Sequence, residues 1–288
     1  MGLHSMAQVL SPAIKQPWAV GAYDVVNLAM VEGVLAAAET DLAPVLILVY
    51  PHSVPSHYFK PLANFVREES QRRNVQTAIV LDHGSSIDQI RLAIDAGFTG
   101  VMIDASALPF EDNIVRTSEV VQFAKKNGVS VEAELGHVGE GDDGLSAENR
   151  RAMFTDADQV REFAERTQVD ALAISIGTAH GVYHFEPELD IERLKQIREQ
   201  VDIALVLHGS SGTPEAQLQK AIGAGIDKIN VYTDIRLKVM QEIHTLLTLK
   251  AADKLDIIDL DSMTRIFTQE VVRQKNLLFG SVGKANAI

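Results

Sequence analysis

The sequence has no cysteine, no long apolar run and no block of basic residues, and each absence excludes a class of protein. Without cysteine among its 288 residues, the chain can form neither disulfides nor thiolate metal sites, and a reducing cytoplasm fits. No apolar stretch approaches the roughly 20 residues of a membrane-spanning helix, and the first residues lack the apolar centre of a signal peptide. The net charge is −13, without a cluster of lysine or arginine. We therefore expect a cytoplasmic protein that binds neither nucleic acid nor a membrane.

Aliphatic residues dominate what the chain does contain. Hydrophobic residues make up 46% of it and aromatic residues only 6%, which suits a core packed from alanine, valine, isoleucine and leucine. Apolar segments alternate with amphipathic ones, the pattern of strands that alternate with helices. The predicted strands are Trp18–Val25, Pro44–Tyr50, Gln76–Asp82, Gly100–Asp104, Ser130–Leu135, Ala171–Gly177, Ala204–His208 and Lys228–Thr233. The predicted helices include Leu28–Thr40, Ile87–Ala96, Asn113–Asn127, Asp156–Thr167, Ile191–Gln200 and Pro214–Ala224.

Eight such alternations favour an α/β fold that closes into a single (β/α)8 TIM barrel. No G-x-G-x-x-G motif follows the first strand, which weighs against an open dinucleotide-binding sheet. No linker or change of composition is visible, so residues 1–288 are predicted to form one domain. Residues 244–288 are predicted to be a helical extension that packs against the barrel or against a partner subunit. Within it, Asp253–Asp261 is expected to be an acidic loop or a short strand.

Three of the predicted strands deliver a histidine followed by glycine to their carboxyl ends: His83, His180 and His208. Because these ends meet at one mouth of a barrel, the three imidazoles should converge. Three neutral imidazoles that leave a fourth position open are the ligand set of a catalytic zinc ion. Histidines that serve only the core are the alternative. Five other histidines rank lower as ligands because none ends a buried strand in this way: His52, His57, His137, His184 and His244.

Several acids are predicted to lie at the same mouth. Asp82 precedes a proposed ligand, so it could carry a proton without binding the metal, or it could orient an imidazole. Glu132 and Glu134 are two apart on one strand and share a face. Glu134 is nearer the mouth and is predicted to face the metal or polarise the substrate, whereas Glu132 is assigned a structural role. Asp104 is either an acid that supports the metal site or a loop cap.

Two loops have the composition of a phosphate site. Gly-Ser-Ser-Gly-Thr-Pro at 209–214 opens the helix after strand seven, and Asn-Val-Tyr-Thr-Asp at 230–234 opens the helix after strand eight. These are the loops where TIM barrels commonly bind phosphate. Gly181 would let a phosphate approach the backbone after strand six. A glycine–serine loop alone is weak evidence, but it gains weight beside a predicted metal site.

Together these motifs closely resemble the class II, zinc-dependent ketose-bisphosphate aldolases, and the fructose- and tagatose-bisphosphate branch fits best. The similarity runs from about residue 18 to residue 284. The motifs that carry it are Leu-Asp-His-Gly at 81–84, Glu-Ala-Glu-Leu-Gly at 132–136, Ile-Gly-Thr-Ala-His-Gly at 176–181, Leu-His-Gly-Ser-Ser-Gly at 207–212, Lys-Ile-Asn-Val-Tyr-Thr-Asp at 228–234 and Leu-Phe-Gly-Ser-Val-Gly-Lys at 278–284.

The resemblance implies reversible aldol cleavage of a ketose 1-phosphate or ketose 1,6-bisphosphate into dihydroxyacetone phosphate and an aldehyde, through a metal-stabilised enediolate. It implies that Asp82 moves the proton of the aldehyde-side hydroxyl and that Glu134 is an acid near the metal. It also implies a Na⁺ or K⁺ ion near Gly181 and Ser211, and a homodimer or homotetramer. The implied zinc ligands are His83, His180 and His208, and the implied binding set for dihydroxyacetone phosphate is Gly181, Gly209, Ser211, Asn230 and Thr233.

The chain departs from the family pattern at several substrate-facing positions. Asp24 stands where the family usually has an asparagine, and Tyr50 stands where it commonly has a serine that binds the far phosphate. Asp142 falls where a mobile loop carries a proton-transferring glutamate. Arg265 matches an arginine that reaches an anionic substrate tail, in its own or in a neighbouring subunit. The identity of the aldehyde half stays open.

Two other functions are compatible with parts of the pattern. Metal-dependent hydrolases on the same barrel also use several histidines and an aspartate, but the His-x-His that they often carry on strand one is absent, since this strand ends Tyr23-Asp24-Val25. A catalytically silent relative could serve as a regulatory or assembly subunit. The intact Asp82, histidine set and phosphate set argue against that alternative.

Overall fold

The computed structural model describes residues 3–141, 144, 146–249 and 254–285. In this part of the chain eight parallel strands form a closed barrel in sequential order, and β1 pairs with β8 to complete it. The strands are β1 Val20–Asp24, β2 Val45–Val49, β3 Thr77–Gly84, β4 Gly100–Ile103, β5 Ser130–Leu135, β6 Ala171–Ile174, β7 Ala204–Leu207 and β8 Lys228–Val231. The predicted (β/α)8 barrel is confirmed, and each predicted strand overlaps an observed one. That residues 1–288 form a single domain stays a prediction.

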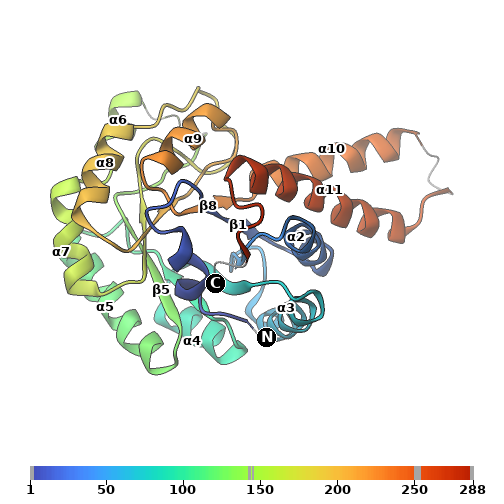
Figure 1. Ribbon diagram of the computed structural model, residues 1–288, viewed down its shortest axis with the longest axis horizontal. Helices are drawn as coiled ribbons and strands as arrows, with labels where there is room; N and C mark the ends of the chain where they lie inside the picture. Colours follow the sequence, from blue (N-terminus) through green and yellow to red (C-terminus); the bar gives the residue numbers. More distant parts are fainter. Residues whose placement is uncertain (1–2, 142–143, 145, 250–253, 286–288) are drawn as a thin grey trace.

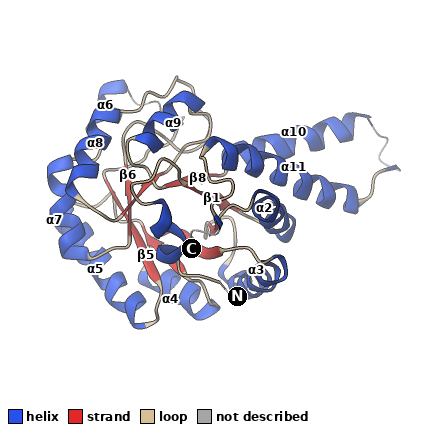
Figure 2. Cartoon of the chain, in the orientation of Figure 1, coloured by secondary structure: helices blue, strands red, loops and turns tan. Residues whose placement is uncertain are grey.

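Helices surround the barrel on its outside (Figures 1 and 2). One main helix follows each strand: α2 Leu28–Asp41, α3 Phe59–Arg73, α4 Ile87–Ala96, α5 Phe110–Lys126, α7 Ala157–Thr167, α8 Ile191–Gln200, α9 Glu215–Gly223 and α10 Thr233–Leu249. The bounds predicted for α4 and α8 are those observed. Side-chain caps explain several starts, since Asn27, Ser86 and Asp156 each accept a hydrogen bond from a backbone N–H of the helix that follows. None of the described helices has the length and apolar composition needed to span a bilayer.

A short N-terminal helix closes the amino end of the barrel. Helix α1, Met6–Leu10, buries Met6, Val9 and Leu10 against apolar side chains that point into the barrel, among them Val80 and Met102. The turn η1, Ser11–Ala13, continues it. Because this end is filled with apolar side chains, polar chemistry is left to the carboxyl ends of the strands.

The remaining elements lie in loops of the barrel or extend beyond it. The turn η2, Ser56–Tyr58, and helix α6, Ala147–Ala152, lie in loops at the carboxyl ends of β2 and β5. Helix α11, Ile257–Leu278, packs against α2 and α10, and α10 and α11 together project from the barrel as an arm (Figure 1). The buried Asn276 anchors α11, since its amide accepts from the Tyr23 hydroxyl at 2.8 Å and donates to Asp41 at 3.1 Å. The predicted C-terminal helical extension is therefore confirmed.

One part of that prediction is wrong. Residues 257–261, expected in an acidic loop or short strand, form the first turn of α11. Asp256 and Asp259 form a capping box. The side chain of each residue accepts a hydrogen bond from the backbone N–H of the other. Acidic residues favour a helix start because they face its unpaired N–H groups and the positive end of its dipole. The acidic run is thus a helix-start signal.

Candidate active site

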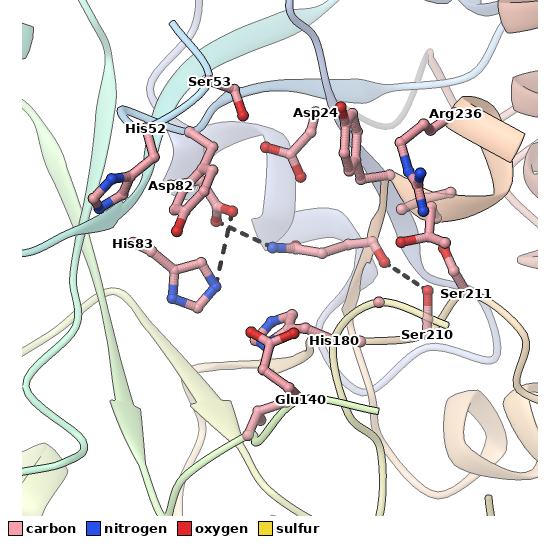
Figure 3. Close-up of a pocket in the computed structure, with 18 of the residues that line it drawn as sticks. Asp24, His52, Ser53, Asp82, His83, Glu140, His180, Ser210, Ser211 and Arg236 are labelled. Atoms are coloured by element: carbon pink, nitrogen blue, oxygen red, sulfur yellow. Dashed lines mark hydrogen bonds and ion pairs between the residues drawn. The ribbon is translucent and has the colours of Figure 1, made fainter. Parts of the chain in front are cut away.

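A cavity of about 560 Å³ opens at the carboxyl ends of the strands. Residues from the carboxyl ends of all eight strands, or from the loops that follow them, line it. Figure 3 shows Asp82, His83 and His180 directed toward one another inside it, with Ser210 and Ser211 on the far side. The single mouth predicted from the strand ends is therefore present.

The three histidines converge at this cavity, where His83 and His180 line it and the fully buried His208 lies behind them. Each of His83, His180 and His208 offers one ring nitrogen, and these atoms lie within 4.8 Å of one another. His83 Nε2 is 3.0 Å from His208 Nδ1, and the ring centroids are 4.8–5.9 Å apart. Three imidazole nitrogens directed at one point form a donor set suited to zinc and other transition metals, and poorly suited to the hard cations Mg²⁺ and Ca²⁺. The residues present therefore fit a catalytic metal ion.

An irregularity in β3 brings Asp82 and His83 to the same cavity. The pairing of β3 with β4 shifts register between Leu81 and Gly84, and His83 has φ 46° in the left-handed region. A regular strand would direct consecutive side chains to opposite faces. Here the bulge turns both toward the mouth. Backbone strain of this kind in a residue other than glycine is typical of functional sites.

Carboxylates fix which ring nitrogen is available in two of the three histidines. Asp104 Oδ2 is 2.9 Å from His83 Nδ1, which leaves Nε2 of that ring for the centre of the cluster. Glu132 Oε1 is 2.9 Å from His208 Nε2, which leaves Nδ1. Such contacts set the tautomer and orientation of metal-binding imidazoles. Of the two roles left open for Asp104, its position favours support of the metal site.

Glu132 is in turn held by a buried lysine. Lys228 Nζ lies 2.6 Å from Glu132 Oε2, and both side chains are fully buried. Burial alone would raise the pKa of Glu132, but the Lys228 ammonium and the contact with His208 outweigh it and lower that pKa to about 2. Glu132 is therefore a carboxylate, and the structural role assigned to it agrees with its contacts.

The electrostatic surroundings differ among the proposed ligands. Burial disfavours the charged form of His83, but the nearby carboxylates, first Asp82 and then Asp104, raise its pKa to about 10. Burial lowers the pKa of His180, and the neighbouring His83 and His208 lower it further. Burial, together with the charge of Asp104, raises the pKa of Glu134. Carboxylates thus raise the pKa of His83, whereas burial and the other histidines lower that of His180.

Comparison with known proteins identifies the fold and chemistry together. The family "Fructose-bisphosphate aldolase class-II" matches residues 4–284. The chain is 40% identical over 290 residues to a fructose-bisphosphate aldolase of Geobacillus stearothermophilus, with 99% of both chains covered. The chain belongs to the class II fructose-bisphosphate aldolase family. It is an aldolase, and hence a carbon–carbon lyase, of a metal-dependent class.

Relatives of this aldolase carry more than one name. It is 39% identical over 291 residues to a 6-phospho-5-dehydro-2-deoxy-D-gluconate aldolase of Halalkalibacterium halodurans, again with 99% of both chains covered. The crystal structure of the YdjI aldolase from Escherichia coli K12 superposes with a TM-score of 0.86 at 35% identity, covering 98% of this chain and 99% of that one. Family membership therefore leaves the substrate of this aldolase open.

Asp82 lies beside the histidine cluster without joining it. Its Oδ1 accepts a hydrogen bond from Asn230 Nδ2 at 3.2 Å, and its Oδ2 is 3.9 Å from His83 Nε2, as the dashed lines in Figure 3 mark. Glu134 is buried beneath the cluster, where Oε1 accepts from the Val138 N–H at 3.0 Å. Glu134 Oε2 has no hydrogen-bond partner among the described residues and is 3.9 Å from His208 Nδ1.

The five residues predicted to bind dihydroxyacetone phosphate all line the cavity: Gly181, Gly209, Ser211, Asn230 and Thr233. Both glycines have positive φ, 85° and 62°. A Cβ on Gly209 would come within 2.4 Å of the Ala179 carbonyl oxygen, so no larger residue fits there. Ser211 Oγ accepts from the Asp234 N–H at 3.2 Å, which ties the β7 loop to the start of α10.

Asp24, Asp142 and Arg265, the other residues predicted on the substrate side, have different outcomes. Asp24 lines the cavity, is 9% exposed, and has one carboxylate oxygen without a partner among the described residues. Burial, and then the charge of Asp82, raises its pKa well above the usual range. Asp142 lies outside the described residues. Arg265 does not line the cavity of its own chain and is 3.7 Å from Glu32 on α2.

The sequence analysis missed two basic residues of this region. Lys228 is an ionisable residue inside an otherwise apolar strand. A buried charge requires a partner, and this feature of the sequence could have identified Lys228. Arg236 lines the cavity from the first turn of α10, three residues after Thr233. That helical spacing is a signal that could have found it. His52, Ser53 and Glu140 also line the cavity but were not assigned a role.

Proposed function

We propose that this aldolase uses zinc and reversibly cleaves a ketose 1-phosphate or ketose 1,6-bisphosphate into dihydroxyacetone phosphate and an aldehyde. The observation that carries the proposal is the convergence of three imidazoles, a non-coordinating carboxylate and a phosphate-type loop pair in one cavity. His83, His180 and His208 would hold the ion. When bound there, zinc supplies a Lewis acid that polarises a substrate carbonyl and stabilises negative charge on oxygen.

The chain's own side chains supply the proton transfers. In the cleavage direction the carboxylate of Asp82 takes the proton of the hydroxyl on the aldehyde half, so that this carbon–oxygen bond becomes a carbonyl as the carbon–carbon bond breaks. The electron pair of that bond passes to the ketone half, which then accepts a proton at carbon. Asp142 stays our candidate for this second transfer. Glu134, whose free oxygen faces His208, supports the polarised oxygens.

Backbone N–H groups and hydroxyls hold the phosphate in this proposal. Gly181 and Gly209 present backbone without side chains, and Ser211 and Thr233 add hydroxyls at the N-terminus of α10. A helix N-terminus favours an anion because its first N–H groups lack internal partners. We also retain a Na⁺ or K⁺ ion near Gly181 and Ser211 as a prediction.

We further propose that the active enzyme is a homodimer or homotetramer in the cytoplasm. Large apolar side chains remain exposed on α10 and α11: Leu237, Met240, Leu247, Leu249, Ile257, Ile258, Ile266 and Leu277. An exposed apolar surface of this kind supports contact with another subunit. Because Arg265 lies on α11 and away from its own cavity, such contact is how it would reach a substrate. The lack of cysteine fits a reducing compartment.

The metal prediction is tested on purified protein. We expect about one zinc ion per chain, bound by three histidines with an open fourth position. A chelator should abolish carbon–carbon cleavage while the far-ultraviolet circular dichroism stays near that of the untreated protein, since the barrel core is built without the ion. His208→Ala should lose the metal, and His244→Ala, a change on α10, is the matched control. A His208→Ala protein that kept both zinc and full turnover would show that the ligand assignment is wrong.

The prediction on specificity rests on Asp24 and Tyr50. Both line the cavity, and the Tyr50 ring lies edge-on to His83 with centroids 6.2 Å apart. The Tyr50 ring takes up space, and Asp24 is an acid whose charged form burial and Asp82 already disfavour. A second phosphate beside Asp24 would meet a like charge or require protonation of Asp24, so both residues should weaken its binding. We expect the preferred aldehyde to be unphosphorylated or to end in a carboxylate, which an arginine such as Arg265 can bind with two hydrogen bonds.

Steady-state kinetics with three substrates tests this specificity. Fructose 1-phosphate or a uronate-type ketose 1-phosphate should have the higher kcat/KM, and fructose 1,6-bisphosphate the lower. The variants Asp24→Asn and Tyr50→Ser should shift the ratio toward the bisphosphate. A clear preference of the unaltered enzyme for the bisphosphate would overturn the prediction.

A further inference from the structure

A chain of hydrogen bonds leads from His83 to the loop after β5. Asp104 Oδ2 lies 2.9 Å from His83 Nδ1, and Asp104 Oδ1 accepts from the Ser106 hydroxyl at 2.7 Å and from the Ser106 N–H at 3.1 Å. Ser106 Oγ is in turn 2.9 Å from Nδ1 of His137, which lies two residues beyond β5. Side chains thus connect the carboxyl ends of β3, β4 and β5.

The carboxylate fixes the direction of every bond in this chain. A carboxylate can only accept, so His83 Nδ1 and the Ser106 hydroxyl both donate to Asp104. A serine hydroxyl has one proton, and the Ser106 oxygen must therefore accept from His137 Nδ1. His137 accordingly favours the orientation of the Ser106 hydroxyl in which its proton points to Asp104.

The same loop also holds the segment that carries a second proposed ligand. The His180 N–H donates to the Gly139 carbonyl at 2.8 Å, and the Gly141 N–H donates to the His180 carbonyl at 2.7 Å. The His137 N–H donates to the Met153 carbonyl at 2.8 Å, which fixes the start of the loop. Residues 137–141 are therefore linked to His180 through backbone and to His83 through side chains. Only the link to His83 can be removed by changing side chains.

We propose that His137 is a positioning residue that holds the metal ligand His83 in place through Ser106 and Asp104. The proposal rests on the metal site of the proposed function, which it deepens. The Asp104 side chain is 24% exposed, so packing alone does not fix it, and its hydrogen bonds must. Contacts of this outer kind orient metal-binding imidazoles and strengthen metal binding. His137 would thereby couple the loop after β5 to a ligand on β3.

The test measures zinc affinity, by competition with a chromogenic chelator added to metal-free protein. For His137→Ala we expect the zinc dissociation constant to rise about 3- to 10-fold, less than the roughly 10- to 100-fold cost of losing a direct partner of a ligand. His137→Asn should stay within about twofold of the unaltered enzyme, because the asparagine amide can donate from nearly the place of Nδ1. The matched control is His57→Ala, which removes an exposed imidazole from η2 and should change nothing.

A double variant decides whether His137 acts through Ser106. Without the hydroxyl His137 has nothing to orient, so Ser106→Ala with His137→Ala should bind zinc as Ser106→Ala alone does. If the two effects multiply instead, the residues act independently and the proposal is overturned. It is also overturned if His137→Ala binds zinc as tightly as His57→Ala does.

Thermal unfolding of the metal-free protein distinguishes positioning from a structural role. The His137 side chain is 43% exposed, so His137→Ala should change the Tm of the metal-free protein by less than about 2 °C. A fall in this Tm without a change in zinc affinity would show that His137 only stabilises the loop.

Nuclear magnetic resonance of metal-free protein, labelled with ¹⁵N in histidine, separates this proposal from the proposed function. A ring N–H that donates to a carboxylate gives a low-field proton signal, and the signal of His83 is identified by its absence from His83→Gln. It should be sharp in the unaltered protein and broadened by exchange with water in His137→Ala. If the unaltered protein binds no zinc but this difference is seen, the positioning role stands and the zinc-dependent reaction fails. If it binds no zinc and the signal is equal in both proteins, or absent from both, both proposals fail.

Discussion

Replacing Asp82 with asparagine is expected to lower turnover by about 10²- to 10⁴-fold, the usual effect of removing a general acid or base. The change conserves shape, because the asparagine oxygen can still accept from Asn230 Nδ2, which now donates to Asp82 Oδ1 at 3.2 Å. It removes the carboxylate that would take the hydroxyl proton. Since Asp82 lies 3.9 Å from His83 Nε2 and outside the histidine set, zinc content and substrate affinity should stay near those of the unaltered enzyme.

Metal analysis beside the kinetics separates the two roles left open for Asp82. Loss of zinc from Asp82→Asn, together with loss of turnover, would show that Asp82 supports the ligand shell and is not the proton carrier. Asp88→Asn is the control, because Asp88 is an exposed acid on α4 that lies 3.6 Å from the exposed Arg91. It should change neither quantity.

The barrel could be predicted because its signals are local. Strands buried on both faces are continuous apolar runs, such as Val45–Val49, and the helices between them show their caps and their amphipathic spacing. The histidine cluster could be predicted for a related reason. A parallel barrel brings all carboxyl strand ends to one mouth, so order along the chain is enough to gather His83, His180 and His208.

What the sequence left open depends on distant contacts and local irregularity. The bulge that turns both Asp82 and His83 into the cavity depends on how β3 pairs with β4, and nothing in the strand's composition marks it. The partner of Lys228 is 96 residues away in sequence. Arg265 was assigned to a substrate through family resemblance, yet the fold of one chain keeps it outside the cavity.

The Lys228–Glu132 pair also shows how the proposed metal site is connected to the barrel core. Asp104 holds His83 from β4, while Glu132 holds His208 from β5 and is itself held from β8. Two of the three proposed ligands, His83 and His208, are therefore held by carboxylates from other strands of the same closed sheet. The barrel interior at this level is polar because it orients imidazoles, whereas the layer below it, around Met6 and Met102, is apolar.

Lys228→Met is accordingly expected to destabilise the protein by roughly 3–5 kcal/mol, the cost of leaving one partner of a buried ion pair uncompensated. Lys228 and Glu132 are both fully buried, and Lys228 Nζ lies 2.6 Å from the carboxylate. For a chain of this size the apparent Tm should fall on the order of 10 °C. Thermal unfolding should be followed at one scan rate in metal-free and in zinc-loaded protein, since ligand binding itself raises Tm.

Two further variants decide whether the buried charge is the cause. Adding Glu132→Gln to Lys228→Met removes the uncompensated charge while keeping an oxygen that can accept from His208 Nε2, so the double variant should recover part of the lost Tm. Lys238→Met removes a lysine of the same length from ion pairs on the surface of α10. It should cost less than about 1 kcal/mol, because exposed pairs are screened by solvent. If Lys228→Met and Lys238→Met lowered Tm equally, the buried Lys228–Glu132 pair would not stabilise the barrel more than a surface ion pair does.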